Sequence, residues 1–330
     1  MGPPLRLGSL GRTARSSIGV LPLLLLCAGF ELANHRFLDP TNLQTIVEQS
    51  AITVVVGVGL TFVIVMGAID LSVEGVMAVS AVGFTLLVRN PINANDLGLL
   101  GAGLAILMGA AFGAFNGAAN AYLRIPSFVA TLGTWSIALG LGTVFLFIFA
   151  LQGEPIIEDP FIRSLGFTNL AGFSTLTLVA FAVALIGFLI ERWTLFGRRA
   201  YAIGGGEETA RLSGISVARY KMGVFTLAGT LFAVAGVMTA VRLGVGTLQI
   251  GVDTLFTSIT AVVIGGTPLS GGRGGVVNTV VGAVTLSALA NGMILAGLPP
   301  IYQQAVQGVV ILAVLSVAAL AYRRHLRVVK

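Results

Sequence analysis

Residues 175–190 read TLTLVAFAVALIGFLI, an apolar run without a charged side chain. Apolar and polar residues do not alternate in it, as they would in a strand of a membrane barrel. Its Ala and Gly content is typical of packed membrane helices, and residues 274–289, GGVVNTVVGAVTLSAL, have the same character. The two stretches predict helices that cross a membrane.

The composition extends this interpretation to the whole chain. Of 330 residues, 56% are hydrophobic and 10% are charged, whereas an ordinary soluble domain has about 25% charged residues. Runs long enough to span a bilayer are found at 18–33, 50–66, 73–88, 98–121, 127–150, 173–191, 222–241, 275–296 and 301–321. A shorter run at 254–266 is expected to cross, with a re-entrant segment as the alternative. We therefore predict a single all-α polytopic membrane domain over 1–330 with about ten transmembrane helices.

The basic residues predict the orientation of these helices. They gather before the first run, between 192 and 221, and at the end of the chain, and positive loops mark the cytoplasmic side. Residues 1–17, 193–221 and 322–330 are accordingly expected in the cytosol, and the acidic stretch 154–159 outside. The first run is expected to be retained, because no small-residue cleavage site follows it.

Few residues could support catalysis or metal binding. A single cysteine, Cys27, excludes an intrachain disulfide and a cysteine metal cluster. His35 and His325 lie in a loop and in the basic tail, so no metal site is predicted. Gly204–Gly206 follows no strand and precedes no Lys-Ser/Thr pair, which argues against a phosphate loop. The net charge is +6. The positive residues are clustered according to membrane topology and are not spread along one face, which argues against a nucleic-acid partner.

Two carboxylates, Asp70 and Glu74, lie between apolar runs in GAIDLSVEG at 67–75. Burying them is costly unless they are paired or cap a helix. The favoured interpretation is that Asp70 or Ser72 is the N-cap of the next helix, with Glu74 in its first turn. A role in a permeation path is the alternative, and an ion-coupled transporter would use both carboxylates as coupling sites.

A second group of polar residues surrounds a predicted turn near Arg124 and Pro126. Asn116 and Asn120 are i,i+4 on one helix face and need partners within the bundle; hydrogen bonding between helices is favoured over substrate contact. Gln249 and Asn291 are isolated polar residues with the same default interpretation. The candidate pathway or gate residues are Asp70, Ser72, Glu74, Asn116, Asn120, Phe128, Thr131 and Asn291.

Four motifs, at 67–81, 116–134, 196–215 and 261–275, occur in an order that resembles a known family. They read GAIDLSVEGVMAVSA, NGAANAYLRIPSFVATLGT, FGRRAYAIGGGEETARLSGI and AVVIGGTPLSGGRGG. The chain resembles, over about residues 40–320, the permease subunits of bacterial ABC importers for monosaccharides, which include ribose, xylose, arabinose, galactofuranose and autoinducer sugar permeases.

The resemblance implies a type II-like permease fold in the bacterial inner membrane, with both termini cytosolic. It also implies a second permease subunit, identical or not, a cytosolic ABC ATPase and a periplasmic sugar-binding protein. A simple sugar or related polyol would be imported by alternating access. This chain would be no enzyme and would bind no cofactor, since ATP and Mg belong to the ATPase.

The resemblance also assigns the basic island at 196–215 as the segment that docks on the ATPase. A short helix at Glu207–Ser213 is expected, with Leu212 as an apolar contact, Arg211 at its polar rim and Gly214 as its C-cap. The implied coupling residues are Ala202, Gly204, Gly205, Glu207, Glu208, Arg211, Leu212, Gly214 and Ile215.

The chain departs from the family pattern at four positions. It has Glu74 where the family usually has Gly, Gly206 where it has Asn, and Leu255 and Thr257 where it has acidic residues. The coupling role is unaffected. Glu74 and the 255–257 region could approach the pathway, so an unusual polyol or derivative sugar is compatible with the sequence.

Overall fold

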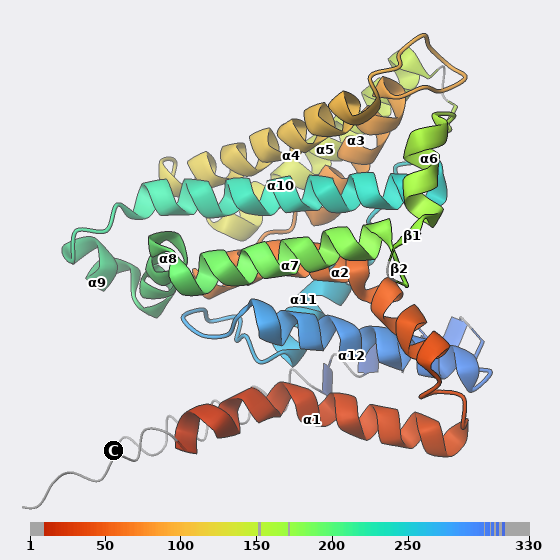
Figure 1. The fold of residues 1–330 in the computed structure, drawn as a ribbon. Coiled ribbons are helices and arrows are strands. Elements are labelled where there is room, and N and C mark those ends of the chain that lie inside the picture. The colour runs from red at the N-terminus through yellow and green to blue at the C-terminus, as the bar shows by residue number, and fades with distance from the viewer. Residues whose placement is uncertain are drawn as a thin grey trace, which may run out of the picture.

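The protein is a bundle of long helices that lie side by side (Figure 1). The computed structural model describes residues 10–150, 153–170, 172–299, 301–303, 305–306, 308–309 and 312–313. In chain order the elements are α1 (Leu10–Ala33), α2 (Pro40–Val65), α3 (Val73–Leu87), α4 (Gly98–Ala121), α5 (Ser127–Phe149), α6 (Pro160–Phe167), β1 (Asn169–Leu170), β2 (Phe173–Ser174), α7 (Thr175–Trp193), α8 (Leu195–Gly205), α9 (Glu207–Leu212), α10 (Val217–Leu243), α11 (Thr254–Ile264) and α12 (Val276–Leu295). The strands β1 and β2 form one antiparallel pair.

Six of these helices, α2, α4, α5, α7, α10 and α12, are long and apolar enough to cross a membrane. Three shorter apolar helical stretches accompany them: the end of α1, α3 and α11. The prediction of a helical polytopic membrane protein is therefore confirmed. The predicted run at 301–321 falls largely outside the described residues.

Helix boundaries follow the predicted runs closely except at two helix starts, and the helix predicted from 18 begins at Leu10. The helix predicted from 50 begins at Pro40, because proline fits the first turn of a helix and the polar residues after it are compatible with helix. The helix α6 and the hairpin β1–β2 were not predicted. Asp159 accepts a hydrogen bond from Ile162 N (3.0 Å) and so caps α6.

The two ends of the bundle differ. The helices α8 and α9 lie at one end, and α6 with β1 and β2 at the other (Figure 1); we call them the α9 end and the α6 end. The acidic stretch 154–159 lies at the α6 end, where Ile157 N donates to Gly244 O (2.9 Å).

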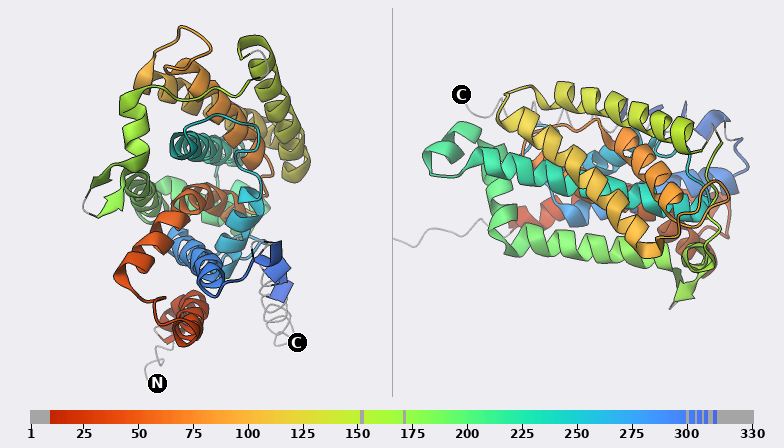
Figure 2. Two further views of the ribbon diagram at one scale, coloured as in Figure 1. Left: turned by 90° about the vertical axis from the view of Figure 1, so that its right-hand side faces the viewer. Right: turned by 90° about the horizontal axis from the view of Figure 1, so that it is seen from above.

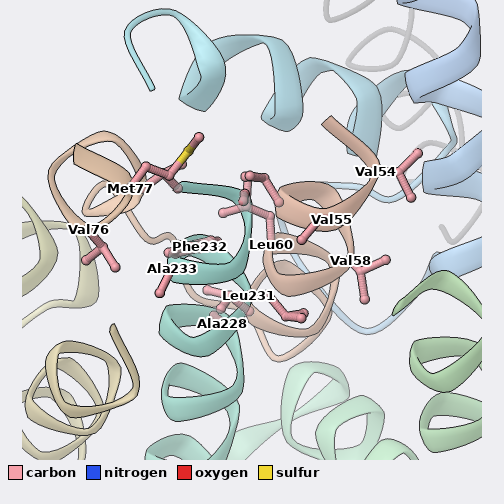
Figure 3. Close-up of a cluster of buried hydrophobic side chains, with 14 of the residues drawn as sticks. Val54, Val55, Val58, Leu60, Val76, Met77, Ala228, Leu231, Phe232 and Ala233 are labelled. Atoms are coloured by element: carbon pink, nitrogen blue, oxygen red, sulfur yellow. The ribbon is translucent and has the colours of Figure 1, made fainter. Parts of the chain in front are cut away.

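The helices α2 and α10 form the centre of the bundle. Val55 and Leu60 of α2 are fully buried, as are Met77 of α3 and Phe232 of α10, and these helices meet in the cluster of Figure 3. The views in Figure 2 show other helices arranged around this centre. By contrast, α4, α5 and α7 bury only about a fifth of their most apolar windows, so their outer faces are apolar surfaces for a bilayer or another membrane chain.

The most extensive contact between two helices joins α4 and α10. Gly109 and Gly113, one turn apart on α4, face α10 there. A Cβ atom at Gly113 would lie 2.2 Å from Phe225 O, and one at Gly229 would lie 2.4 Å from Gly109 O. Such distances allow no side chain, so the two backbones touch directly. Close packing of this kind is what holds membrane helices together where no water drives their association.

Two non-helical segments interrupt the bundle, and both lie beside α3. Residues 66–72 lead from α2 into α3, and residues 244–253 lead from α10 into α11. Gly246 packs on Thr85 near the end of α3, and Gly251 packs on Glu74 at its beginning. The loop after α11 then reaches the α9 end, where Gly272 N donates to Val65 O (2.8 Å). The short run at 254–266 thus forms a half-helix of 11 residues, α11, which follows the non-helical, turn-rich segment 244–253.

The α4–α10 contact generates a stability prediction. Gly113→Ala forces the two backbones apart, so we expect the free energy of unfolding to fall by about 1–3 kcal/mol. The matched control is Gly133→Ala in α5, where an added Cβ meets no described atom within 4 Å; its effect should be neutral or stabilising by up to about 1 kcal/mol. Thermal unfolding in detergent measures both, and equal stability of the two variants would contradict the packing argument.

Candidate functional site

A short helix at the α9 end carries the residues expected to dock on a partner. The helix α9 ends in a Schellman motif: Gly214 has φ +81°, Gly214 N donates to Arg211 O (3.0 Å) and Ile215 N donates to Ala210 O (3.1 Å). Only glycine adopts this left-handed conformation without strain. The helix predicted at Glu207–Ser213 is present, one residue shorter.

The outer surface of α9 combines an apolar side chain with charges. Leu212 is 80% exposed, whereas Ala210 points inward and is buried. Arg211 pairs with Glu208, and this hydrogen bond and charge raise the pKa of the Arg211 guanidinium. Glu207 pairs with Lys221 of α10 (2.8 Å) and so holds α9 to the bundle. An exposed leucine with a charged rim is what a protein contact requires.

The helix α8 directly precedes α9 and anchors it to the bundle. Thr194 caps α8 by accepting a hydrogen bond from Gly197 N (3.2 Å). A Cβ atom at Gly204 would lie 1.8 Å from Val65 O, so this position admits only glycine, whereas one at Gly205 meets no described atom within 4 Å. Ala202 is exposed. The structure thus brings all the predicted coupling residues together at the α9 end.

A buried polar cluster lies where the segment 66–72 meets α4 and α5. Asn116 Nδ2 donates to Ser72 Oγ (3.1 Å), and Thr134 Oγ1 donates to Asn116 Oδ1 (2.5 Å). Thr131 Oγ1 accepts a hydrogen bond from Leu71 N (2.9 Å). All the side chains in these bonds are buried. The favoured interpretation of Asn116, hydrogen bonding between helices, is what the structure shows.

The predicted cap of α3 is wrong in its detail. Ser72 occupies the N-cap position, but its side chain makes no capping hydrogen bond. Its hydroxyl donates to Asp70 Oδ1 (2.6 Å), and the same oxygen accepts from Ser72 N (2.8 Å). Asp70 therefore closes a local turn before the helix, and Ser72 is committed to Asp70 and Asn116.

Glu74 connects two helix N-termini. It lies in the first turn of α3, as predicted, and its Oε1 accepts a hydrogen bond from Asp253 N (3.1 Å) at the start of α11. A carboxylate is favourable at the positive end of a helix dipole, and here one carboxylate serves two helices. Sequence reasoning missed Asp253, since 179 residues separate the partners.

The remaining predicted pathway residues lie apart from this cluster. Asn120 Nδ2 donates to Ile125 O (2.9 Å) in the turn after α4, and Phe128 is exposed at the start of α5. Asn291 of α12 is buried, yet none of the described residues bonds to its Oδ1. Within the described part of the chain, no group of three His, Cys, Asp or Glu side chains could hold a metal ion.

Comparison with known proteins shows similarity to transport permeases over most of the chain. Residues 42–315 match the family described as "Branched-chain amino acid transport system / permease component". The ribose import permease protein RbsC of Bacillus subtilis is 36% identical over 304 residues, 88% of this chain and 89% of its own length. The probable ABC transporter permease protein YphD of Escherichia coli is 34% identical over 297 residues, 90% of this chain and 87% of its own length.

A more distant relative is named for another sugar. The galactose/methyl galactoside import permease protein MglC of Haemophilus influenzae is 29% identical over 316 residues, which are 92% of this chain and 94% of that protein. No solved structure matched the chain.

The buried cluster predicts different costs for two buried asparagines. Asn116→Leu leaves the Ser72 and Thr134 hydroxyls without their partner, so we expect a loss of about 1–3 kcal/mol in unfolding free energy. Asn291→Leu removes an oxygen that bonds to none of the described residues, and its cost should be smaller. Thermal unfolding of the isolated chain in detergent compares them, and the reverse order would refute the cluster's role in stability.

Proposed function

Since the chain belongs to the branched-chain amino acid transport system / permease component family, we propose that it imports a simple sugar or related polyol as the membrane subunit of an ATP-driven ABC importer. The family consists of permease components, so this chain is a transport subunit and no enzyme, and a separate subunit hydrolyses ATP. Its long apolar helices make it a multi-pass membrane protein.

The proposed substrate class rests on the relatives. Although the family description names amino acids, relatives at 36% and 29% identity that cover about nine tenths of this chain are named for ribose and galactose import. Two different sugars on one scaffold favour a sugar or polyol for this chain. A periplasmic sugar-binding protein is then the expected donor of the substrate.

One observation carries the proposed coupling to an ATPase: Leu212 is 80% exposed on a short helix at the end of the bundle. The ion pair of Glu207 with Lys221 fixes this helix to α10, and the contact of Gly204 with Val65 fixes α8, which directly precedes it, to α2. A force on α9 therefore acts on the bundle. We assign ATPase docking to α9, with Leu212 as the central contact and Arg211 at the rim.

The charges support a cytosolic α9 end in a bacterial inner membrane. The described basic residues at this end are Arg124, Arg192, Arg198, Arg199, Arg211, Arg219, Lys221 and Arg273. Those at the α6 end are Arg36, Arg89, Arg163 and Arg242, and the acidic stretch 154–159 accompanies them. This bias follows the positive-inside rule and supports the proposal that both termini are cytosolic.

The half-helix α11 supports the proposal of about ten crossings in a type II-like fold, with the non-helical segment 244–253 and α11 forming one crossing. The face of this crossing is exposed at Gln249, Val252, Asp253 and Phe256. Non-helical backbone and a carboxylate at membrane depth cannot face lipid; they must contact protein or line a water-filled cavity. We propose that a second permease subunit, identical or not, covers this face and that the pathway runs between the two.

Transport then proceeds by alternating access. ATP closes the partner ATPase pair, α9 moves as a rigid lever, and the permease pair opens outward to accept the substrate; hydrolysis resets it. No residue of this chain forms or breaks a covalent bond, and none binds a cofactor. The relatives favour this cycle over the ion-coupled alternative.

The docking assignment is tested by co-purification with the ATPase subunit from membranes. Leu212→Asp and Arg211→Glu should weaken the association roughly tenfold or more, as expected at the centre of an interface, and reduce ATPase activity in the complex. Leu170→Asp is the matched control, because Leu170 is an exposed leucine at the α6 end. The proposal would be overturned if the ATPase bound all three variants equally, or if no ATPase associated with the wild-type permease.

A further inference from the structure

Two side chains at the turn between α7 and α8 join three parts of the chain. Tyr201 of α8 donates from its hydroxyl to Glu191 Oε1 of α7 (2.7 Å), and the same hydroxyl lies 2.8 Å from Gly274 O. Glu191 Oε2 accepts a hydrogen bond from Val276 N (2.7 Å). Both oxygens of one carboxylate are therefore in use. We call this pair of side chains the Glu191–Tyr201 latch.

The Glu191–Tyr201 latch supplies a side-chain cap that the start of α12 lacks. The N-cap of α12 is Gly275, which has no side chain to cap the helix, so Glu191 binds the first helical amide from outside. A carboxylate there is also favoured by the helix dipole. A Cβ atom at Gly275 would lie 2.6 Å from Glu191 Oε1, so the glycine makes room for the carboxylate.

The Tyr201 hydroxyl is suited to act as a permanent hydrogen-bond donor. Burial, and then its hydrogen bond to Glu191, raise the pKa of this hydroxyl. It therefore stays protonated and continues to donate at physiological pH.

The end of α8 touches the same loop a second time. Gly204 packs against Gly272 N and Val65 O, and Gly272 N donates to Val65 O (2.8 Å). The helix α8 thus meets the loop 265–275 at Tyr201 and again at Gly204. Two contacts one turn apart resist rotation of α8 against the loop, whereas one contact would act as a pivot.

We propose that Glu191 and Tyr201 are positioning residues that fasten α8 to the start of α12, so that movement of α9 carries the loop 265–275 and α12 with it. This inference rests on the proposed function and adds how the force is delivered. Without the latch, α9 still docks on the ATPase, but part of its movement is lost as rotation of α8. More ATP is then hydrolysed for each molecule transported.

The test uses the reconstituted complex of permease, ATPase and binding protein in vesicles. Tyr201→Phe removes only the hydroxyl, and Glu191→Gln weakens the same contacts. We expect both variants to retain the ATPase, while the ATP consumed per ribose molecule imported rises roughly fivefold, the factor that one net hydrogen bond corresponds to. The control is Tyr122→Phe, because Tyr122 is exposed after α4 at the same end of the bundle.

A distance measurement separates the latch from general loss of structure. Spin labels at Arg198→Cys and Val277→Cys, both exposed positions, in a Cys27→Ser background report the separation of α8 and α12. The distance distribution should be narrow with Tyr201 and broad with Tyr201→Phe. An unchanged distribution together with an unchanged ATP-to-sugar ratio would overturn the inference. A wild-type complex without ATP-driven uptake of any sugar would contradict the proposed function instead, and the distance measurement alone would then decide on the latch.

Discussion

Non-helical backbone inside a membrane bundle must find hydrogen-bond partners within the protein, because lipid offers none. Between α2 and α3 side chains supply them: Ile69 N donates to Ser127 Oγ (3.1 Å) and Leu71 N to Thr131 Oγ1 (2.9 Å). At the start of α11, Glu74 does the same for Asp253 N. Each partner belongs to a neighbouring helix, so satisfying the broken backbone also fixes how α3, α5 and α11 lie. The positions of these three helices follow from that requirement.

This requirement also explains why the most conspicuous polar residues are poor candidates for substrate binding. Asn116, Ser72 and Thr131 are buried and occupied by one another and by the backbone. What remains accessible near them is the partly exposed Glu74 and the exposed Asp253. The proposed pathway would therefore offer few polar groups to a substrate, which fits weak binding during transport and selection by a separate binding protein. It is consistent with one scaffold among relatives named for ribose and for galactose.

The sequence predicted what depends on local pattern and missed what depends on distant contacts. Long apolar runs gave the helices, and Gly214 after an amphipathic turn gave the end of α9, because both signals are local. Asp70 or Ser72 was predicted to cap α3; Ser72 takes the N-cap position, but its hydroxyl binds Asp70, and no local pattern distinguishes this outcome from a capping hydrogen bond. The partners of Glu74 and Glu191 lie 179 and 85 residues away, beyond any periodicity. The helix α6 was missed because its cap, Asp159, was interpreted as an orientation charge.

The two contacts of α8, at Tyr201 and at Gly204, are connected through different segments to the neighbouring starts of α3 and α11. At its end, Gly204 touches Val65, from which residues 66–72 run to the start of α3. The loop 265–275, held at Gly272 and Gly274, leads back through α11 to its start at Thr254. The starts of α3 and α11 meet where Glu74 binds Asp253 N. A displacement of α8 would therefore reach α3 and α11 from the same side, and the N-termini of these two helices are linked by the hydrogen bond from Asp253 N to Glu74 and by the packing of Gly251 on Glu74. Glu74, at a position where the family resemblance implies a glycine, thus joins the starts of α3 and α11, and a gate proposed here would have to separate them.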